Sequence, residues 1–155
     1  TETFDNIRVM DTKDVGVSAA RNAGLDSAEG AFVTFVDADD RLRPKTLQVL
    51  FDCIMKTGSD AAGCSFEGWE KEEEWETFLS KRYAIGEPVK YIPSDYLKEE
   101  ILKGNSRCWS KLYRRAAIGS LRFKEGLTIG EDMLFLVQFQ SRIRGVAETA
   151  YPGYG

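Results

Sequence analysis

The chain has 155 residues, of which 43% are hydrophobic and 30% are charged, values that are typical of one folded domain or part of one. Its net charge of −4 gives no electrostatic case for binding nucleic acid. Histidine is absent, which excludes a Ser-His-Asp triad, a Cys-His pair and a Cys/His zinc site within this chain. The three cysteines form no CxxC pair and no apolar run approaches a transmembrane length, so we expect a reduced, cytosolic setting.

The first part of the chain predicts a short strand and then a helix. Apolar residues alternate over 7–10, as they do in a strand. Residues 16–26 (GVSAARNAGLD) predict a helix with Ser18 as its N-cap. Arg21 and Asn22 then fall in its first turn, where backbone N–H groups and the helix dipole favour an anion. The alternative is an amphipathic surface helix with a solvent-facing arginine, and this stretch alone leaves both open.

Residues 31–42 (AFVTFVDADDRL) form the most informative stretch. Residues 31–36 predict a strand buried on both faces, of the kind found in parallel sheets. Three acids follow at once, namely Asp37, Asp39 and Asp40. Ligands of open α/β sheets bind beyond the carboxyl ends of strands, so Asp37 and Asp39 can hold a divalent cation that also binds substrate phosphates. A solvated acidic turn that caps the next helix is the plainer alternative.

The middle of the chain predicts a helix, a strand and a long irregular segment. Residues 44–57 carry a helical apolar stripe, and Gly58 ends it. Residues 60–69 (DAAGCSFEGW) predict a strand. The charged stretch 70–76 (EKEEEWE) predicts a solvated loop or hairpin insertion, and residues 77–89 support no assignment.

A helix is predicted over 95–103, and an aromatic and basic cluster follows at 106–115 (SRCWSKLYRR). In one interpretation the core contains Trp109, Leu112 and Tyr113, and the cations point outward. In the other, one of these aromatics presents a flat face to a sugar ring while Lys111 or an arginine meets phosphate. The pattern alone leaves both open.

The last part of the chain places two acids at the start of a helix. Gly130, Glu131 and Asp132 precede an apolar helix over 133–139. Acids in a first turn are expected from the helix dipole, so capping is one interpretation of both. The other is a ligand site, because Gly130 permits close approach to the backbone. A final strand is predicted over 146–151.

Three segments, 16–42, 108–115 and 122–135, together resemble the inverting family 2 glycosyltransferases, especially bacterial polysaccharide-building members. The resemblance rests on a D-x-D motif that follows a helix of SAARNAG type, on CWSKLYRR, and on Glu-Asp after a glycine-containing loop. It extends over about residues 7–139. It implies an α/β fold, the Rossmann-like GT-A nucleotide-diphospho-sugar transferase fold.

The resemblance also implies a role for each matching residue. Asp37 is similar to the carboxylate near the donor's ribose or sugar, and Asp39, with Asp37, to the ligands of Mn²⁺ or Mg²⁺. Arg21 and Asn22 match the donor-binding helix. Asp132 matches the general base, which deprotonates the acceptor hydroxyl for attack with inversion. The acceptor-side loop corresponds to Trp109, Lys111 and Tyr113.

From the same resemblance we expect residues 1–155 to be part of one GT-A catalytic domain, without the family's amino-terminal nucleotide-binding strands. Such a fragment is expected to be inactive alone and to self-associate through an exposed sheet edge. The expected partners are a nucleotide-sugar donor, with a UDP-sugar favoured, and a glycan or lipid-linked acceptor. The expected location is cytoplasmic, including peripheral contact with the inner face of the membrane.

Two other functions compete with this one. A phosphatase of the haloacid dehalogenase type also has a D-x-D after an apolar strand, but Arg41 stands where that chemistry needs Thr or Val. A glycosyltransferase-like module that binds sugar nucleotide or a partner without catalysis is the non-enzyme alternative.

Overall fold

Five strands form one mixed sheet in the structure, a computed structural model that describes residues 6–12 and 16–155. The strand order is β1-β4-β2-β5-β3, in which β2 and β5 are parallel and the other neighbours are antiparallel. The elements in chain order are α1 (Val17–Ser27), β1 (Phe32–Thr34), α2 (Thr46–Thr57), β2 (Ala61–Phe66), α3 (Glu72–Ser80), β3 (Val89–Tyr91), α4 (Pro93–Glu99), the 3₁₀ helix η1 (Ile101–Lys103), β4 (Lys111–Arg114), α5 (Arg115–Ile118), α6 (Glu131–Gln140) and β5 (Val146–Tyr154).

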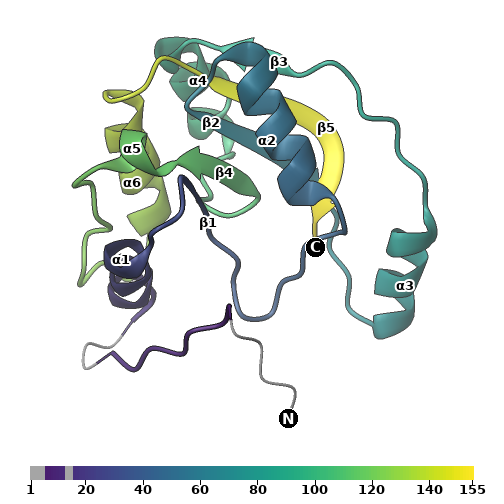
Figure 1. Cartoon of the computed structure of the whole chain (residues 1–155), viewed down its shortest axis with the longest axis horizontal. Helices are drawn as coiled ribbons and strands as arrows, with labels where there is room; N and C mark the ends of the chain where they lie inside the picture. Colours follow the sequence, from purple (N-terminus) through teal and green to yellow (C-terminus); the bar gives the residue numbers. More distant parts are fainter. Residues whose placement is uncertain (1–5, 13–15) are drawn as a thin grey trace.

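Helices cover both faces of the sheet. On one face α2 crosses β2 and β5 (Figure 1) and buries Leu50 and Ile54 against them. On the other face α4 and α6 pack around an aromatic cluster of Phe35, Tyr113 and Phe135. This α/β arrangement confirms the predicted fold class. It also directs the carboxyl ends of β1, β2 and β5 toward the same side, because these three strands run in one direction.

The strand before the acidic motif differs from the prediction. It was expected over residues 31–36, buried on both faces in a parallel sheet, but β1 spans only Phe32–Thr34 and all three residues are partly exposed. Its strand partner within the described residues is β4, which runs antiparallel to it. The apolar run is explained by contacts on both faces, because Phe32 packs against α2 and Phe35 enters the aromatic cluster, while Val36 stays exposed.

Two further segments correct the predictions. Residues 7–10 form no strand and are exposed. The stretch 70–76, predicted as a loop, contributes to α3, because Trp75 and Phe78 lie three residues apart and are both buried. Three glutamates in the first turn of α3 favour the same helix through its dipole. Figure 1 shows α3 set apart from the sheet, at the end of a long connection.

The predicted helices are present with shifted ends. Helix α1 begins after Gly16, so Ser18 lies inside it rather than at its N-cap. Helix α2 begins at Thr46 rather than at residue 44, but it ends before Gly58, as predicted, and Gly58 has the left-handed conformation. The predicted helix over 95–103 is divided between α4 and η1. No helix within 6–12 and 16–155 is both long enough and apolar enough to cross a membrane.

The last strand is longer than predicted and adds a residue beside the acidic motif. It was predicted over 146–151, but β5 continues to Tyr154, and residues 151–155 are buried. Gly155 exchanges two backbone hydrogen bonds with Arg41, which closes the turn after the acidic motif. The Gly/Pro/Tyr end of the chain is therefore part of the sheet and brings Tyr154 next to the acidic motif.

Asp60 anchors the start of β2. Its carboxylate accepts hydrogen bonds from the backbone N–H of Arg144 at 2.7 Å and from its guanidinium at 2.7 Å, and the Asp60 side chain is only 8% exposed. Burial alone would raise the pKa of Asp60, but the hydrogen bonds from Arg144 outweigh it and lower the pKa. The ionised carboxylate therefore stabilises the fold above its unfolded pKa, and this contribution is lost as the pH falls through the lower folded pKa.

We expect Asp60→Asn to lower the free energy of unfolding by about 1–2 kcal/mol at pH 7, since a charge-assisted bond is lost but Arg144 is largely exposed. The difference from wild type should shrink as the pH falls below about 4. Urea unfolding at both pH values tests this, with Asp52→Asn, an exposed carboxylate on α2, as the matched control. An equal loss at both pH values would contradict the ionic explanation.

Candidate active site

Arg21 on α1 joins acidic residues from two distant parts of the chain. Its guanidinium lies 2.9 Å from Asp37 Oδ1, 2.6 Å from Asp132 Oδ1 and 3.6 Å from Glu131 Oε1. The Arg21 side chain is only 10% exposed and also lies over the Phe123 ring. Burial alone would lower the pKa of Arg21, but Asp37 and Asp132 outweigh it and raise the pKa. The cation therefore stays charged between these carboxylates.

Asp132 is held at both carboxylate oxygens. Arg21 binds Oδ1, and the backbone N–H of Cys108 donates to Oδ2 at 3.0 Å. The loop that carries Cys108 is itself fixed, because the Tyr113 hydroxyl donates to the Cys108 carbonyl at 2.7 Å. Burial, followed by the nearby Asp132 carboxylate, raises the pKa of the Cys108 thiol. This cysteine is therefore a neutral neighbour of the site rather than a nucleophile.

The acidic turn is tied to the end of β5 by Tyr154. The Asp37 backbone N–H donates to the Tyr154 hydroxyl at 3.1 Å, and that hydroxyl donates to Asp40 Oδ2 at 2.6 Å. The Tyr154 ring stacks on Trp109 with 4.6 Å between ring centroids. Burial, followed by the hydrogen bond to Asp40, raises the pKa of Tyr154. Tyr154 was not predicted as a site residue, although an aromatic residue just after the predicted last strand was a signal that could have indicated it.

The acidic turn offers one free carboxylate for a divalent cation. Asp39 is exposed and has no hydrogen-bond or ion-pair partner among the described residues, whereas Asp37 and Asp40 are engaged. Within 6–12 and 16–155, no group of three or more metal-ligating side chains could hold an ion alone. Magnesium-type ions bind through one or two carboxylates together with water and substrate phosphates, so this donor set fits an ion that arrives with a diphosphate.

A hollow of about 470 Å³ lies beside this turn. Asp39 and Asp40 line it from the turn, and Trp109, Tyr154 and Phe66 line it with aromatic rings. Trp109 is partly exposed and also packs edge-on against Phe66. Of the three residues predicted on the acceptor side, Trp109 alone reaches this hollow.

Three other predicted residues make contacts inside the protein. Asn22 donates to the Phe123 carbonyl at 3.0 Å and accepts from the Phe123 N–H at 2.8 Å, so it fixes the loop after α5. Lys111 is 1% exposed, and Tyr113 is 0% exposed in the aromatic cluster. Their position in this structure leaves neither Lys111 nor Tyr113 a surface for an acceptor. This favours the core interpretation of Tyr113, because β4 lies between β1 and β2 in the sheet.

Comparison with known proteins identifies the family. Residues 2–129 match the model of glycosyl transferase family 2, and the chain belongs to that family. It is 28% identical to an uncharacterized glycosyltransferase, YibD, of Escherichia coli over 99% of this chain and 46% of that protein. It is 29% identical to the minor teichoic acid biosynthesis protein GgaA of Bacillus subtilis over 95% of this chain and 33% of that protein. The chain thus spans less than half the length of these relatives.

A solved structure confirms the fold. The crystal structure of Staphylococcus aureus TarS 1–349 in complex with UDP-GlcNAc superposes with a TM-score of 0.65 at 23% identity, over 94% of this chain and 40% of that one. The predicted GT-A-type glycosyltransferase fold is therefore correct. Family membership also shows that the haloacid dehalogenase alternative is wrong.

We expect Arg21→Met to lower the free energy of unfolding by about 3 kcal/mol at pH 7, because three carboxylates would remain together without their cation. The loss should shrink as the pH falls toward about 4, where carboxylates become neutral. Urea unfolding measures it, with Arg8→Met as control, because the Arg8–Glu29 pair is exposed on both sides and should leave stability unchanged. Equal effects of the two substitutions would contradict the bridging role of Arg21.

Proposed function

We propose that this chain is part of one GT-A catalytic domain that transfers a sugar from a nucleotide-diphosphate donor to an acceptor hydroxyl with inversion. The observation that carries the proposal is the Arg21 bridge, which holds Asp37 and Asp132 on the same guanidinium. A single displacement needs the donor on one side of the reacting carbon and a base for the acceptor on the other. In the proposed reaction, the bridge would hold the donor side at a fixed distance from the base.

In this proposal Asp132 is the general base. Its oxygens accept from Arg21 and from the Cys108 N–H, so the carboxylate keeps one orientation and retains lone pairs for an acceptor hydroxyl. The proton of that hydroxyl moves to Asp132 as the oxygen attacks the anomeric carbon. The bond from that carbon to the diphosphate oxygen breaks at the same time, and its electron pair leaves with the nucleoside diphosphate.

The donor side is assigned to Asp37, Asp39 and Arg21. Asp39 and the donor phosphates would hold a Mn²⁺ or Mg²⁺ ion, with Asp37 near it. The ion would neutralise charge that develops on the leaving diphosphate. Asn22 would not contact the donor but would position the loop at Phe123, because its side-chain amide already binds the backbone of that residue.

The substrates follow from the relatives. TarS has been solved with UDP-GlcNAc, which favours a UDP-sugar as the donor of this protein. GgaA acts in minor teichoic acid biosynthesis, which favours a cell-surface polysaccharide or a lipid-linked glycan as the acceptor. A cytoplasmic reaction at the inner face of the membrane stays a prediction. Self-association through β1, one of the two edge strands of the described sheet, also stays a prediction.

We expect Asp132→Asn, tested in the full-length protein, to reduce turnover by about 10²–10⁴-fold, because an amide cannot accept the acceptor proton. Binding of the nucleotide sugar should change little. The matched control is Glu131→Gln, whose carboxylate lies farther from Arg21 and which should cost far less. Release of nucleoside diphosphate measures turnover, and calorimetry measures binding. The reverse ranking would show that the base is assigned to the wrong acid.

We expect Asp39→Asn to abolish metal-dependent activity and to leave the melting temperature unchanged, because its exposed side chain has no partner among the described residues. A screen of nucleotide sugars with Mn²⁺ and with chelator measures the activity, and Asp52→Asn is the control. Wild-type turnover by the variant, or full activity of the wild type in excess chelator, would contradict the metal role. A wild type that turns over no nucleotide sugar would favour the non-catalytic module instead.

A further inference from the structure

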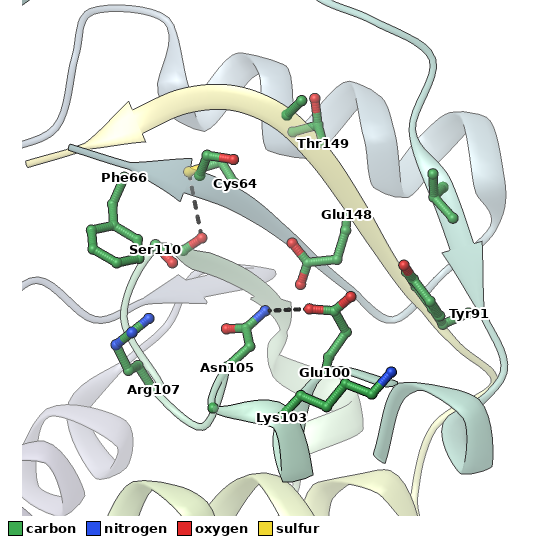
Figure 2. A pocket seen from close by; sticks show the side chains of 14 residues that line it. Cys64, Phe66, Tyr91, Glu100, Lys103, Asn105, Arg107, Ser110, Glu148 and Thr149 are labelled. Atoms are coloured by element: carbon green, nitrogen blue, oxygen red, sulfur yellow. Dashed lines mark hydrogen bonds between the residues drawn. The ribbon is translucent and has the colours of Figure 1, made fainter. Parts of the chain in front are cut away.

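A second pocket, of about 590 Å³, lies on the face of the sheet away from α2 and is distinct from the Arg21 cluster (Figure 2). Its volume is within the range of small-molecule sites, about 300–1,000 Å³. Carboxylate, amide and aromatic groups converge on it from β2, β3, β5 and the segment around η1. In Figure 2, Glu148, Glu100 and Asn105 point toward its middle.

The floor of this pocket is fixed before any ligand binds. Glu148 lies opposite Gly63 on the neighbouring strand, and a Cβ on Gly63 would clash with the Glu148 carboxylate. The Tyr96 hydroxyl donates to Glu148 Oε1 at 2.6 Å. Asn105 donates to Glu100 at 3.1 Å and accepts from the buried ammonium of Lys111 at 2.9 Å. Each polar side chain of the floor therefore has a set orientation.

A row of stacked side chains connects this pocket to the acidic turn. Phe66 lines both this pocket and the hollow beside Asp39. Arg107 lies over Phe66 at 4.5 Å and over Trp109 at 5.0 Å. Trp109 in turn stacks on Tyr154, whose hydroxyl binds the turn. An elongated ligand that reacts beside Asp39 can thus extend past Phe66 into the pocket.

The lining selects the chemistry of the ligand. Glu100 and Glu148 are hydrogen-bond acceptors when ionised and suit the hydroxyl groups of a sugar or polyol. The rings of Phe66 and Tyr91 offer apolar faces for the C–H side of a sugar ring. Two cations also line the pocket, but the Lys103 ammonium pairs with Glu99 and the Arg107 guanidinium lies over the rings of Phe66 and Trp109. A phosphate at the floor would meet the two carboxylates. The charges of the floor therefore favour an uncharged, polyhydroxylated ligand.

We propose that this pocket binds a neutral sugar unit of the acceptor, one that lies away from the hydroxyl that reacts. The assignment of this sugar to the acceptor rests on the proposed function. The binding of a sugar in this pocket does not depend on it. The pocket would thus select acceptors by the sugar that precedes the new linkage. This role replaces the one expected of Lys111, which supports the pocket from below through Asn105.

The test is binding of four neutral oligosaccharides, maltotriose, mannotriose, lactose and chitotriose, to the full-length protein without donor. Ligand-observed NMR should detect at least one of them with a dissociation constant of about 1 mM or lower. Ala150→Trp places a large ring in the pocket from an exposed position of β5 and should weaken that binding at least tenfold. The control Ala84→Trp, at an exposed position that does not line the pocket, should leave it unchanged.

Failure of this inference is distinguishable from failure of the proposed function, because the assay needs no turnover. No binding by any of the four sugars, or equal binding by Ala150→Trp and wild type, would overturn the neutral-sugar pocket. Binding of glycerol 3-phosphate that Ala150→Trp removes, without binding of the sugars, would overturn its neutral chemistry. Sugar binding in a protein that turns over no nucleotide sugar would support the pocket and contradict the glycosyltransferase proposal.

Discussion

The structure depends on one partly buried arginine that neutralises acids from opposite ends of the chain. Arg21 reaches Asp37, sixteen residues away, and Asp132, 111 residues away, from a single helix. Carboxylates this close together repel one another unless a cation lies between them. The guanidinium suits this position because it donates from several nitrogens in a fixed plane. Helix α1, the turn after β1 and the start of α6 are thereby held together.

Strand β4 transmits this constraint to the rest of the sheet. It lies between β1 and β2, and the side chains of Lys111 and Tyr113 bind two consecutive carbonyls of the loop before it. Lys111 donates to the Arg107 carbonyl at 3.0 Å, and Tyr113 donates to the Cys108 carbonyl at 2.7 Å. Burial lowers the pKa of Lys111, while the nearby Glu148 carboxylate opposes that shift. The buried lysine and tyrosine thus shape the loop that holds Asp132.

The two hollows share one aromatic boundary. Phe66 lies between the space beside Asp39 and the pocket over Glu148, since it lines both, and Trp109 packs edge-on against it. Rigid aromatic rings lose little conformational entropy when they order a surface, so such a boundary can be fixed without a ligand. In the proposed reaction, chemistry and acceptor selection would therefore occur in neighbouring but separate spaces.

The α/β class, helices α1, α2 and α6, and the family could be predicted from the sequence, because helical periods, glycine stops and motif spacing are local properties. Three features required the folded structure: Asn22 binds a loop, Lys111 and Tyr113 are buried, and residues 152–154 extend β5 beside the acidic turn. Burial and side-chain partners depend on segments that are distant in the chain, such as Phe123, which lies 101 residues from Asn22, and no local pattern encodes them. The same reason explains α3, where the charges predicted a loop but burial of Trp75 and Phe78 stabilises a helix.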